Sequence, residues 1–164
     1  MTKPFNPMAT YAYSKDGYDK SGSLEYTGYG FEGLNGDGVD ELIIGNMSDD
    51  GRLDKMVYLI GTIHNNVPYG VLTSMENGNY YICDDNKISY ECRGNFGEDY
   101  KLYQFSSDGT ATECIGGISS YKNSDTGEIS YKTTDKNGTT VDEISEEEFE
   151  TEKKNILVKK FRYS

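Results

Sequence analysis

Apolar and polar residues alternate in short stretches over most of this chain, and Gly, Asn and Asp separate the stretches. A period of two is typical of strands, and Asn-Gly and Asp-Gly pairs are typical of tight turns between them. The pattern predicts a mainly β (α+β) fold, with an antiparallel meander or sandwich-like sheet. The predicted strands are Leu42–Gly45, Lys55–Ile63, Val67–Met75, Tyr80–Cys83, Lys87–Cys92, Asp99–Phe105, Thr110–Tyr121 and Ile129–Thr133.

The end of the chain is predicted to form one helix, from about residue 146 to residue 158. Ser145 and Glu148 have the spacing of a capping box, in which each residue satisfies a backbone donor of the other. Ile144 and Phe149 occupy the hydrophobic-staple positions around this box. We expect the helix to pack on the sheet, although residues 156–161 are also compatible with a final strand.

Length and composition predict one β-rich domain over residues 25–164, preceded by a polar N-terminal arm at residues 1–24. A chain of 164 residues can bury a sizeable core. It contains 15 Tyr and no Trp. We expect most of the tyrosines to line the core or brace the sheet, and a tyrosine-rich binding face is the alternative. The absence of Trp argues mildly against a platform on which sugars stack.

The formal net charge is −12, from 28 acidic and 16 basic residues, and it narrows the set of partners. Such a charge repels nucleic acid and anionic membrane surfaces, so neither is an expected partner. No apolar run approaches the ~20 residues of a membrane-spanning helix, and we expect no membrane insertion by this segment. The first residues also lack the apolar stretch of a secretory leader. We therefore expect either a cytoplasmic protein or a chain that begins after a removed leader.

A candidate metal loop precedes the first predicted strand. Asn35, Asp37 and Glu41 hold positions 3, 5 and 9 of a nine-residue pattern, and the carbonyl of Val39 holds position 7. Oxygen atoms at this spacing converge on one hard cation, such as Ca²⁺, when glycine allows the chain to turn sharply. Position 1 is Gly33, which supplies no side chain.

A second candidate loop follows at the same offsets, at Asn46, Ser48, Asp50 and Asp54. Two of its four side chains are neutral, so we expect it to hold a cation less well than the first loop. The alternative for both loops is an ordinary Gly/Asp turn whose polar groups are satisfied by backbone hydrogen bonds.

The segment Leu34-Asn-Gly-Asp-Gly-Val-Asp-Glu-Leu-Ile-Ile44 resembles the Asp-x-Asn-x-Asp-Gly-x-x-Glu-Leu calcium loops of FG-GAP type, found in integrin propeller blades and many secreted bacterial proteins. The wider pattern resembles a group of uncharacterised secreted or lipid-anchored proteins of Gram-positive bacteria. In these, such a segment precedes a Tyr-rich sheet and the chain closes with a motif like Ile144-Ser-Glu-Glu-Glu-Phe149. The resemblance implies an extracellular or cell-surface location and one β-rich domain, and it implies no enzymatic activity.

The sequence does not favour a catalytic or disulfide-based site. Cys83, Cys92 and Cys114 are too far apart for a disulfide scaffold, and we expect buried or partly buried thiols, with a Cys92–Cys114 disulfide as the alternative. A symmetric hairpin centred on residues 85 and 86 would pair Cys83 with Ile88. The single histidine, His64, lies in the turn of a predicted hairpin between Lys55–Ile63 and Val67–Met75, where a polar residue is ordinary.

The sequence is compatible with two functions. The first is a non-enzymatic extracellular module with a structural calcium loop and an unknown protein or cell-surface partner. The second is an acidic cytosolic inhibitor or immunity-type protein that binds a basic protein, because complementary charge speeds association.

Overall fold

The structure, a computed structural model, describes residues 27–47, 53–74, 78–83 and 85–158, with the side chains of residues 47, 53–55 and 158 left out. The described residues form ten strands and one helix, and neighbouring strands pair in antiparallel orientation. This confirms the predicted mainly β fold with a C-terminal helix. The chain divides into two compact units. The predicted single domain over residues 25–164 stays a prediction, and the predicted arm at residues 1–24 lies outside the described residues.

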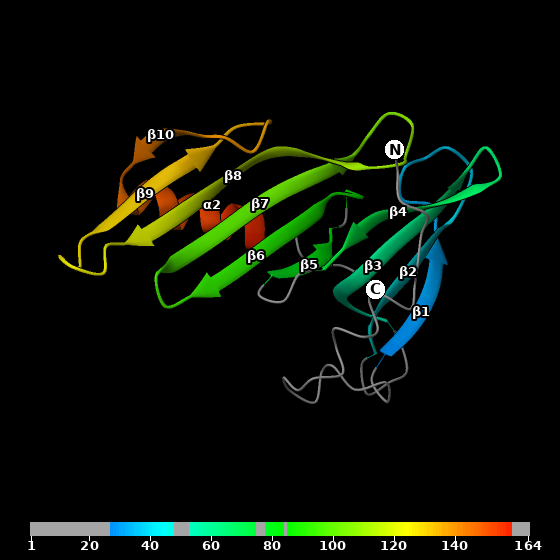
Figure 1. The fold of residues 1–164 in the computed structure, drawn as a ribbon, viewed down its shortest axis with the longest axis horizontal. Coiled ribbons are helices and arrows are strands. Elements are labelled where there is room, and N and C mark those ends of the chain that lie inside the picture. The colour runs from blue at the N-terminus through cyan, green and yellow to red at the C-terminus, as the bar shows by residue number, and fades with distance from the viewer. Residues whose placement is uncertain (1–26, 48–52, 75–77, 84, 159–164) are drawn as a thin grey trace. The chain divides into compact units, whose positions relative to one another are not determined.

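Unit 1 contains four strands in meander order, together with residues 105–112 (Figure 1). Its strands are β1 (Thr27–Glu32), β2 (Glu41–Met47), β3 (Leu53–His64) and β4 (Val67–Thr73). The predicted hairpin between β3 and β4 is confirmed. Its two turn residues, Asn65 and Asn66, have φ values of 52° and 63°. Asparagine tolerates these left-handed angles, which match the turn to the strand twist.

The continuous apolar run Leu42–Ile44 is consistent with burial on both faces of the sheet, but the two faces of β2 differ. Ile43 is buried, but Leu42 and Ile44 on the other face are only half-buried. Ile43 shares its side of the sheet with its cross-strand partner Ile60, which is completely buried. The strand therefore has one fully buried face, as expected for an antiparallel sheet.

Unit 2 is a meander of six strands with a helix on one face (Figure 1). Its elements are β5 (Gly78–Ile82), β6 (Ile88–Gly94), β7 (Gly97–Phe105), β8 (Thr112–Lys122), β9 (Ile129–Thr134), β10 (Thr140–Ile144) and α2 (Glu146–Val158). Strand β10 was not predicted. In the β5–β6 hairpin Ile82, not Cys83, pairs with Ile88. The prediction for Cys83 was wrong because Asn86 adopts a φ of 56° and the Cys83 amide donates to the Lys87 carbonyl, which closes the turn one residue earlier.

Helix α2 begins and ends where the sequence predicts. The Ser145 Oγ accepts from the Glu148 amide at 3.2 Å, and the Ser145 amide donates to the Glu148 carboxylate at 2.8 Å, which completes the capping box. The helix buries Phe149 and Ile156 against Tyr100 and Ile118 of the sheet. Burial of this apolar face, and not helix propensity alone, holds a helix of this length in place.

Candidate functional site

The loop at residues 33–41 connects β1 to β2 and brings together the three side chains that the sequence singled out. The Asn35 Oδ1 accepts from the Asp37 amide at 2.9 Å, and the Asp37 Oδ1 accepts from the Val39 amide at 2.8 Å. Gly36 and Gly38 have φ values of 77° and 87°, which a residue with a side chain rarely adopts. The two successive turns curl the loop so that Asn35 and Asp37 face Glu41.

Glu41 is the most buried acidic residue of the described chain, with no exposed surface. One carboxylate oxygen, Oε2, accepts from the Leu34 amide at 2.7 Å, and the other, Oε1, accepts from the Thr62 hydroxyl at 3.1 Å. Thr62 lies on β3, which pairs with β2. The Glu41 carboxylate therefore joins the loop to β3. The burial of a carboxylate costs free energy unless its charge is compensated. The loop therefore needs a positive charge or hydrogen-bond donors beside Glu41.

A single amide nitrogen joins the two carboxylates of the loop. The Asn35 Nδ2 donates to the Asp37 Oδ2 at 3.1 Å and to the Glu41 Oε1 at 3.0 Å. The nitrogen carries only a partial positive charge, yet it lies between two negative groups. A rotation of the Asn35 amide that exchanges its two terminal atoms would place a third oxygen beside both carboxylates, at the cost of the bond from the Asp37 amide.

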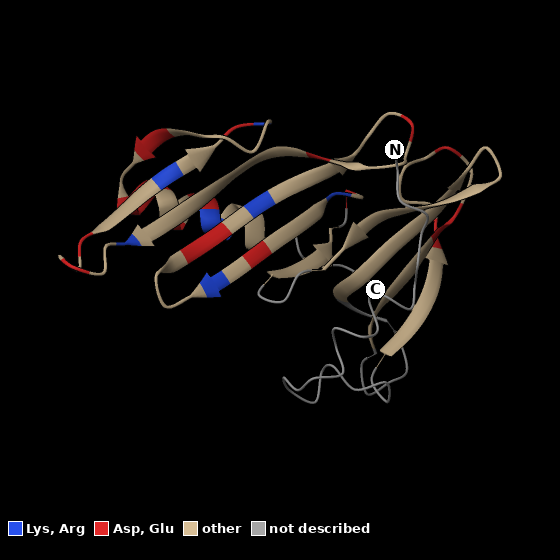
Figure 2. Ribbon diagram, in the orientation of Figure 1, with Lys and Arg blue, Asp and Glu red and all other residues tan. Residues whose placement is uncertain are grey.

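Among the described side chains around the loop, the formally charged ones are acidic and none is a Lys or Arg. The charged residues of unit 1 with described side chains include Glu32, Asp37, Asp40, Glu41 and Asp108. The described side chains of this unit include no Lys or Arg (Figure 2). Glu32 pairs directly with Glu41 across the β1–β2 ladder. The acidic residues among the described side chains of unit 1 give the loop a field that favours a cation.

The donor set fits a hard cation in kind. Carboxylate, amide and carbonyl oxygens are the ligands that Ca²⁺ prefers, and it takes six to eight of them. The loop presents Asp37, Glu41 and Asn35, so carbonyl groups such as that of Val39 and water would have to supply the rest. Within the described residues, no three His, Cys, Asp or Glu side chains come together as a metal-holding group. The loop therefore offers two carboxylates and an amide, a weaker set than the full pattern.

The turn at residues 106–111 contacts this loop, and the sequence analysis missed it. A Cβ built on Gly109 would lie 2.1 Å from the Asn35 Nδ2 and 3.4 Å from the Asp37 Oδ2, and Gly109 itself is buried with a φ of 70°. Only glycine meets both conditions, because the backbone approaches closely and adopts a left-handed angle. The Asp-Gly pair at this position signals a turn, but nothing local to the sequence shows what the turn touches.

Asp108 shapes the turn that carries Gly109. Its carboxylate accepts from the Ser106 hydroxyl at 2.7 Å and from the amide and hydroxyl of Thr110 at 3.1 and 2.9 Å. The bond from Ser106, followed by those from Thr110, lowers the pKa of Asp108 to about 2. His64 lies near enough to lower this pKa further. The turn therefore keeps an ionised carboxylate at neutral pH.

The second candidate loop is described only in part. Ser48 and Asp50 lie outside the described residues, as does the side chain of Asp54. The Asn46 Oδ1 accepts from the Tyr58 hydroxyl at 2.5 Å, so this oxygen is already engaged across the β2–β3 pair. The prediction of a second metal loop stays a prediction.

The cysteines and His64 form no site with one another in the described part of the chain. Cys83, Cys92 and Cys114 form no disulfide within the described structure, as expected, and Cys83 is buried whereas the other two are half-buried. His64 ends β3 and contacts the Tyr69 ring edge-on, with 6.2 Å between the ring centroids.

No described helix is both long and apolar enough to span a membrane. Comparison of the chain with protein families, curated proteins and solved structures gave no match.

Proposed function

We propose that this chain is a non-enzymatic, β-rich extracellular module whose loop at residues 33–41 binds Ca²⁺ as a structural ion. Asp37 and Glu41 supply the charge, and Asn35 and the Val39 carbonyl supply neutral oxygens. The bound ion ties the loop to β2 and, through the Thr62 hydroxyl, to β3. Its ligand or partner is a protein or another component of the cell surface.

One observation carries this proposal: the fully buried Glu41 carboxylate is joined to Asp37 by the Asn35 amide alone, in a unit whose described side chains include no Lys or Arg. Neutral donors stabilise a buried carboxylate less than a full positive charge does. A divalent cation between the two carboxylates supplies that charge. The extracellular location rests on the resemblance to secreted proteins, and extracellular calcium is abundant enough for a site of ~10⁻⁴–10⁻³ M affinity.

A thermal melt with excess EDTA and then with millimolar calcium tests the cation site. An ion that binds only the folded chain stabilises it by RT ln(1 + [L]/Kd), which is about 1 kcal/mol when the ion exceeds Kd several-fold. For a chain of this length we expect a rise in Tm of about 2–4 °C. Magnesium at the same concentration should raise Tm less, because Mg²⁺ demands a stricter geometry and gives up its water reluctantly.

Asp37→Ala and Asp40→Ala form a matched pair for this melt. Both variants remove one exposed carboxylate from the loop, but only Asp37 takes part in the Asn35–Glu41 contacts. We expect Asp37→Ala to abolish the calcium-dependent rise and Asp40→Ala to keep it. If both variants lose the calcium-dependent rise in Tm equally, the calcium effect is general charge screening. If the unaltered chain shows no rise in Tm, the loop is an ordinary turn.

The acidic inhibitor remains the second candidate, because the same acidic surface of unit 1 suits a basic protein. It is separated from the first by the melt. A chain that does not respond to calcium but binds a basic protein with strongly salt-dependent association kinetics would be an inhibitor of this kind.

A further inference from the structure

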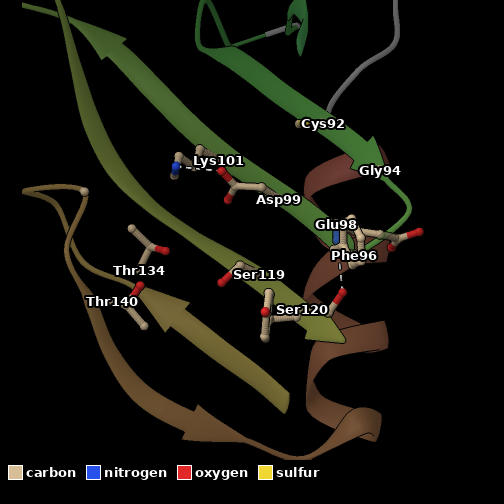
Figure 3. Close-up of a pocket in the computed structure, with 13 residues that line it drawn as sticks. Cys92, Gly94, Phe96, Glu98, Asp99, Lys101, Ser119, Ser120, Thr134 and Thr140 are labelled. Atoms are coloured by element: carbon tan, nitrogen blue, oxygen red, sulfur yellow. Dashed lines mark hydrogen bonds and ion pairs between the residues drawn. The ribbon is translucent and has the colours of Figure 1, made fainter. Parts of the chain in front are cut away.

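A groove lies in unit 2 on the sheet face that turns away from α2. Tyr100 and Ile118 point to the helix, so their neighbours Asp99 and Ser119 point to the opposite face. The groove crosses β6 to β10 and has a volume of about 420 Å³, within the range of about 300–1,000 Å³ that small-molecule sites occupy (Figure 3). Gly117 pairs with Thr134 across β8 and β9, and a Cβ built on it would lie 2.4 Å from the Tyr100 carbonyl oxygen, so glycine allows β7 and β8 to approach closely beside the groove.

The groove contains a carboxylate oxygen without a partner. The Asp99 Oδ1 is shielded from solvent and accepts no hydrogen bond in the described structure, whereas the Oδ2 accepts from the Lys101 Nζ at 2.7 Å. An unpaired buried acceptor costs free energy that a donating ligand would recover. Lys101 has further N–H groups beyond the one that Asp99 uses, so this pair offers both an acceptor and donors.

Three hydroxyl groups surround the same space. Ser119, Thr134 and Thr140 point into the area beside Asp99 and Lys101 (Figure 3). Within the described residues, none of these three hydroxyls forms a hydrogen bond, although Thr134 is only 7% exposed. Each hydroxyl can donate one bond and accept two. The groove therefore holds more unused hydrogen-bonding capacity than a surface of ordinary turns and ladders.

Two aromatic rings border this groove. Phe96 in the β6–β7 turn is 60% exposed, and Tyr121 at the end of β8 is 57% exposed. Tyr121 shares the groove face with Ser119, since the two are separated by two positions on one strand. Rings at the rim provide flat apolar contact area next to the polar floor.

We propose that this groove binds a neutral polyhydroxyl ligand, a carbohydrate of one or two sugar units. Sugar hydroxyls can donate to the Asp99 carboxylate, whose side chain is 31% exposed, and accept from Lys101, and the three unbonded hydroxyls match the alternating donors and acceptors of a sugar ring. The Asp99–Lys101 pair carries no net charge, so it favours a neutral ligand over a cation or an anion. Phe96 and Tyr121 would replace the tryptophan that the chain lacks as the stacking surface.

This site is independent of the calcium loop, because all of its lining residues belong to unit 2. A titration followed by amide NMR tests it, with maltose, cellobiose and N,N′-diacetylchitobiose as neutral probes and with arginine and galacturonate as charged controls. We expect saturable shifts at residues 92–101 and 117–121 with a neutral probe at millimolar concentration. Sedimentation with insoluble cellulose and chitin then distinguishes a free sugar from a polysaccharide chain as the source.

Two variants and one control connect the binding to the groove. Asp99→Asn should weaken the affinity about tenfold, because the mutation replaces a charged acceptor by a neutral amide. Tyr121→Ala should weaken it about three- to tenfold through the lost ring contact, without loss of folding since the ring is exposed. Tyr29→Ala removes an even more exposed tyrosine, 72% exposed, from unit 1 and should leave the affinity unchanged.

The proposal is overturned by any of three results. The first is the absence of groove shifts with all three neutral sugars. The second is an equal response to arginine or galacturonate, which would make the contact one of charge alone. The third is a Tyr29→Ala variant that loses as much affinity as Tyr121→Ala, which would place the sugar elsewhere.

Discussion

The two units treat their carboxylates in opposite ways. In unit 2 acidic side chains lie beside basic ones from the same unit: Lys153 contacts Glu98, Lys101 contacts Asp99, and Arg93 contacts Glu91. In unit 1 the buried Glu41 carboxylate meets an amide, a hydroxyl and a backbone N–H. A sheet that pairs its charges internally needs no ion, whereas a sheet that buries a carboxylate among neutral donors gains from one.

The units also differ in how their sheets are supported. Helix α2 supplies Phe149 and Ile156 to the core of unit 2, and the capping box fixes where that helix begins. In unit 1 the loop that contains Asn35 packs against the turn at Gly109, which comes from a distant part of the chain. Both units bury apolar side chains, but the stability of unit 1 should depend in addition on the geometry of a polar loop.

The largest expected effect comes from Phe149→Ala. Phe149 is 1% exposed, and its ring centroid lies 5.0 Å from that of Tyr131 and 6.3 Å from that of Tyr100. Removing a buried ring of this kind costs about 3–5 kcal/mol of unfolding free energy. Urea unfolding followed by circular dichroism measures the loss, and hydrogen exchange locates it. We expect lost protection in β7 to β9 and an unchanged calcium response in unit 1; loss of that response as well would show one cooperative domain and no division of roles.

Gly109→Ala should have the next largest effect, with Gly138→Ala as its matched control. Both glycines have left-handed φ values, 70° and 77°, so alanine at either position costs about 1–2 kcal/mol. A Cβ at Gly138 would meet no atom within 4 Å, whereas one at Gly109 would collide with Asn35. The collision should add about 1–3 kcal/mol and abolish the calcium-dependent rise in Tm.

Thermal melts of the two glycine variants, with and without calcium, separate strain from function. If Gly138→Ala loses the calcium response too, the response does not come from the loop that Gly109 supports. If Gly109→Ala retains it, the contact with Asn35 is irrelevant to the cation, and the loop needs no support from the distant turn.

Local signals in the sequence were sufficient where the structure depends on neighbours along the chain. The capping box predicts where α2 begins, because all its contacts lie within four positions. The Asn65–Asn66 turn was predictable for the same reason. Strand β10 was missed because Thr140–Ile144 is short and almost entirely exposed, so its burial pattern has no period of two. The Cys83 pairing failed by one residue, since turn length depends on a backbone angle at Asn86.

The sequence predicted only those residues of the candidate site that lie close together along the chain. Asn35, Asp37 and Glu41 are close in sequence, and their spacing alone placed them together. The complete burial of Glu41 depends on the fold, and its bond from Thr62 spans 21 residues. The contact from Gly109 and the groove around Asp99 arise from pairing between distant strands, and single-sequence patterns carry no information on such pairing.

The pair of Lys153 and Glu98 gives the smallest expected effect, and it tests the claim that unit 2 satisfies its charges internally. The Lys153 Nζ donates to the Glu98 Oε2 at 2.5 Å, and the two side chains are 17% and 30% exposed. Burial alone would raise the pKa of Glu98, but the bonds from Lys153 and Tyr100 lower it below its usual 4.5. Burial alone would lower the pKa of Lys153, but the bond from Glu98 raises it above 10.5.

These opposite shifts fix the pH range in which the pair stabilises the fold. A carboxylate whose pKa is lowered by folding contributes stability above its unfolded value, and this contribution is lost as pH falls below 4.5. An ammonium whose pKa is raised contributes below 10.5 and loses its contribution as pH rises beyond that value. Lys153→Met should therefore cost about 1 kcal/mol at neutral pH and flatten the decline in stability below pH 4.5. Urea unfolding at several pH values measures both effects, with Lys154→Met, an exposed neighbour on the helix, as the control; an equal decline in both variants would mean that Glu98 is stabilised by something other than Lys153.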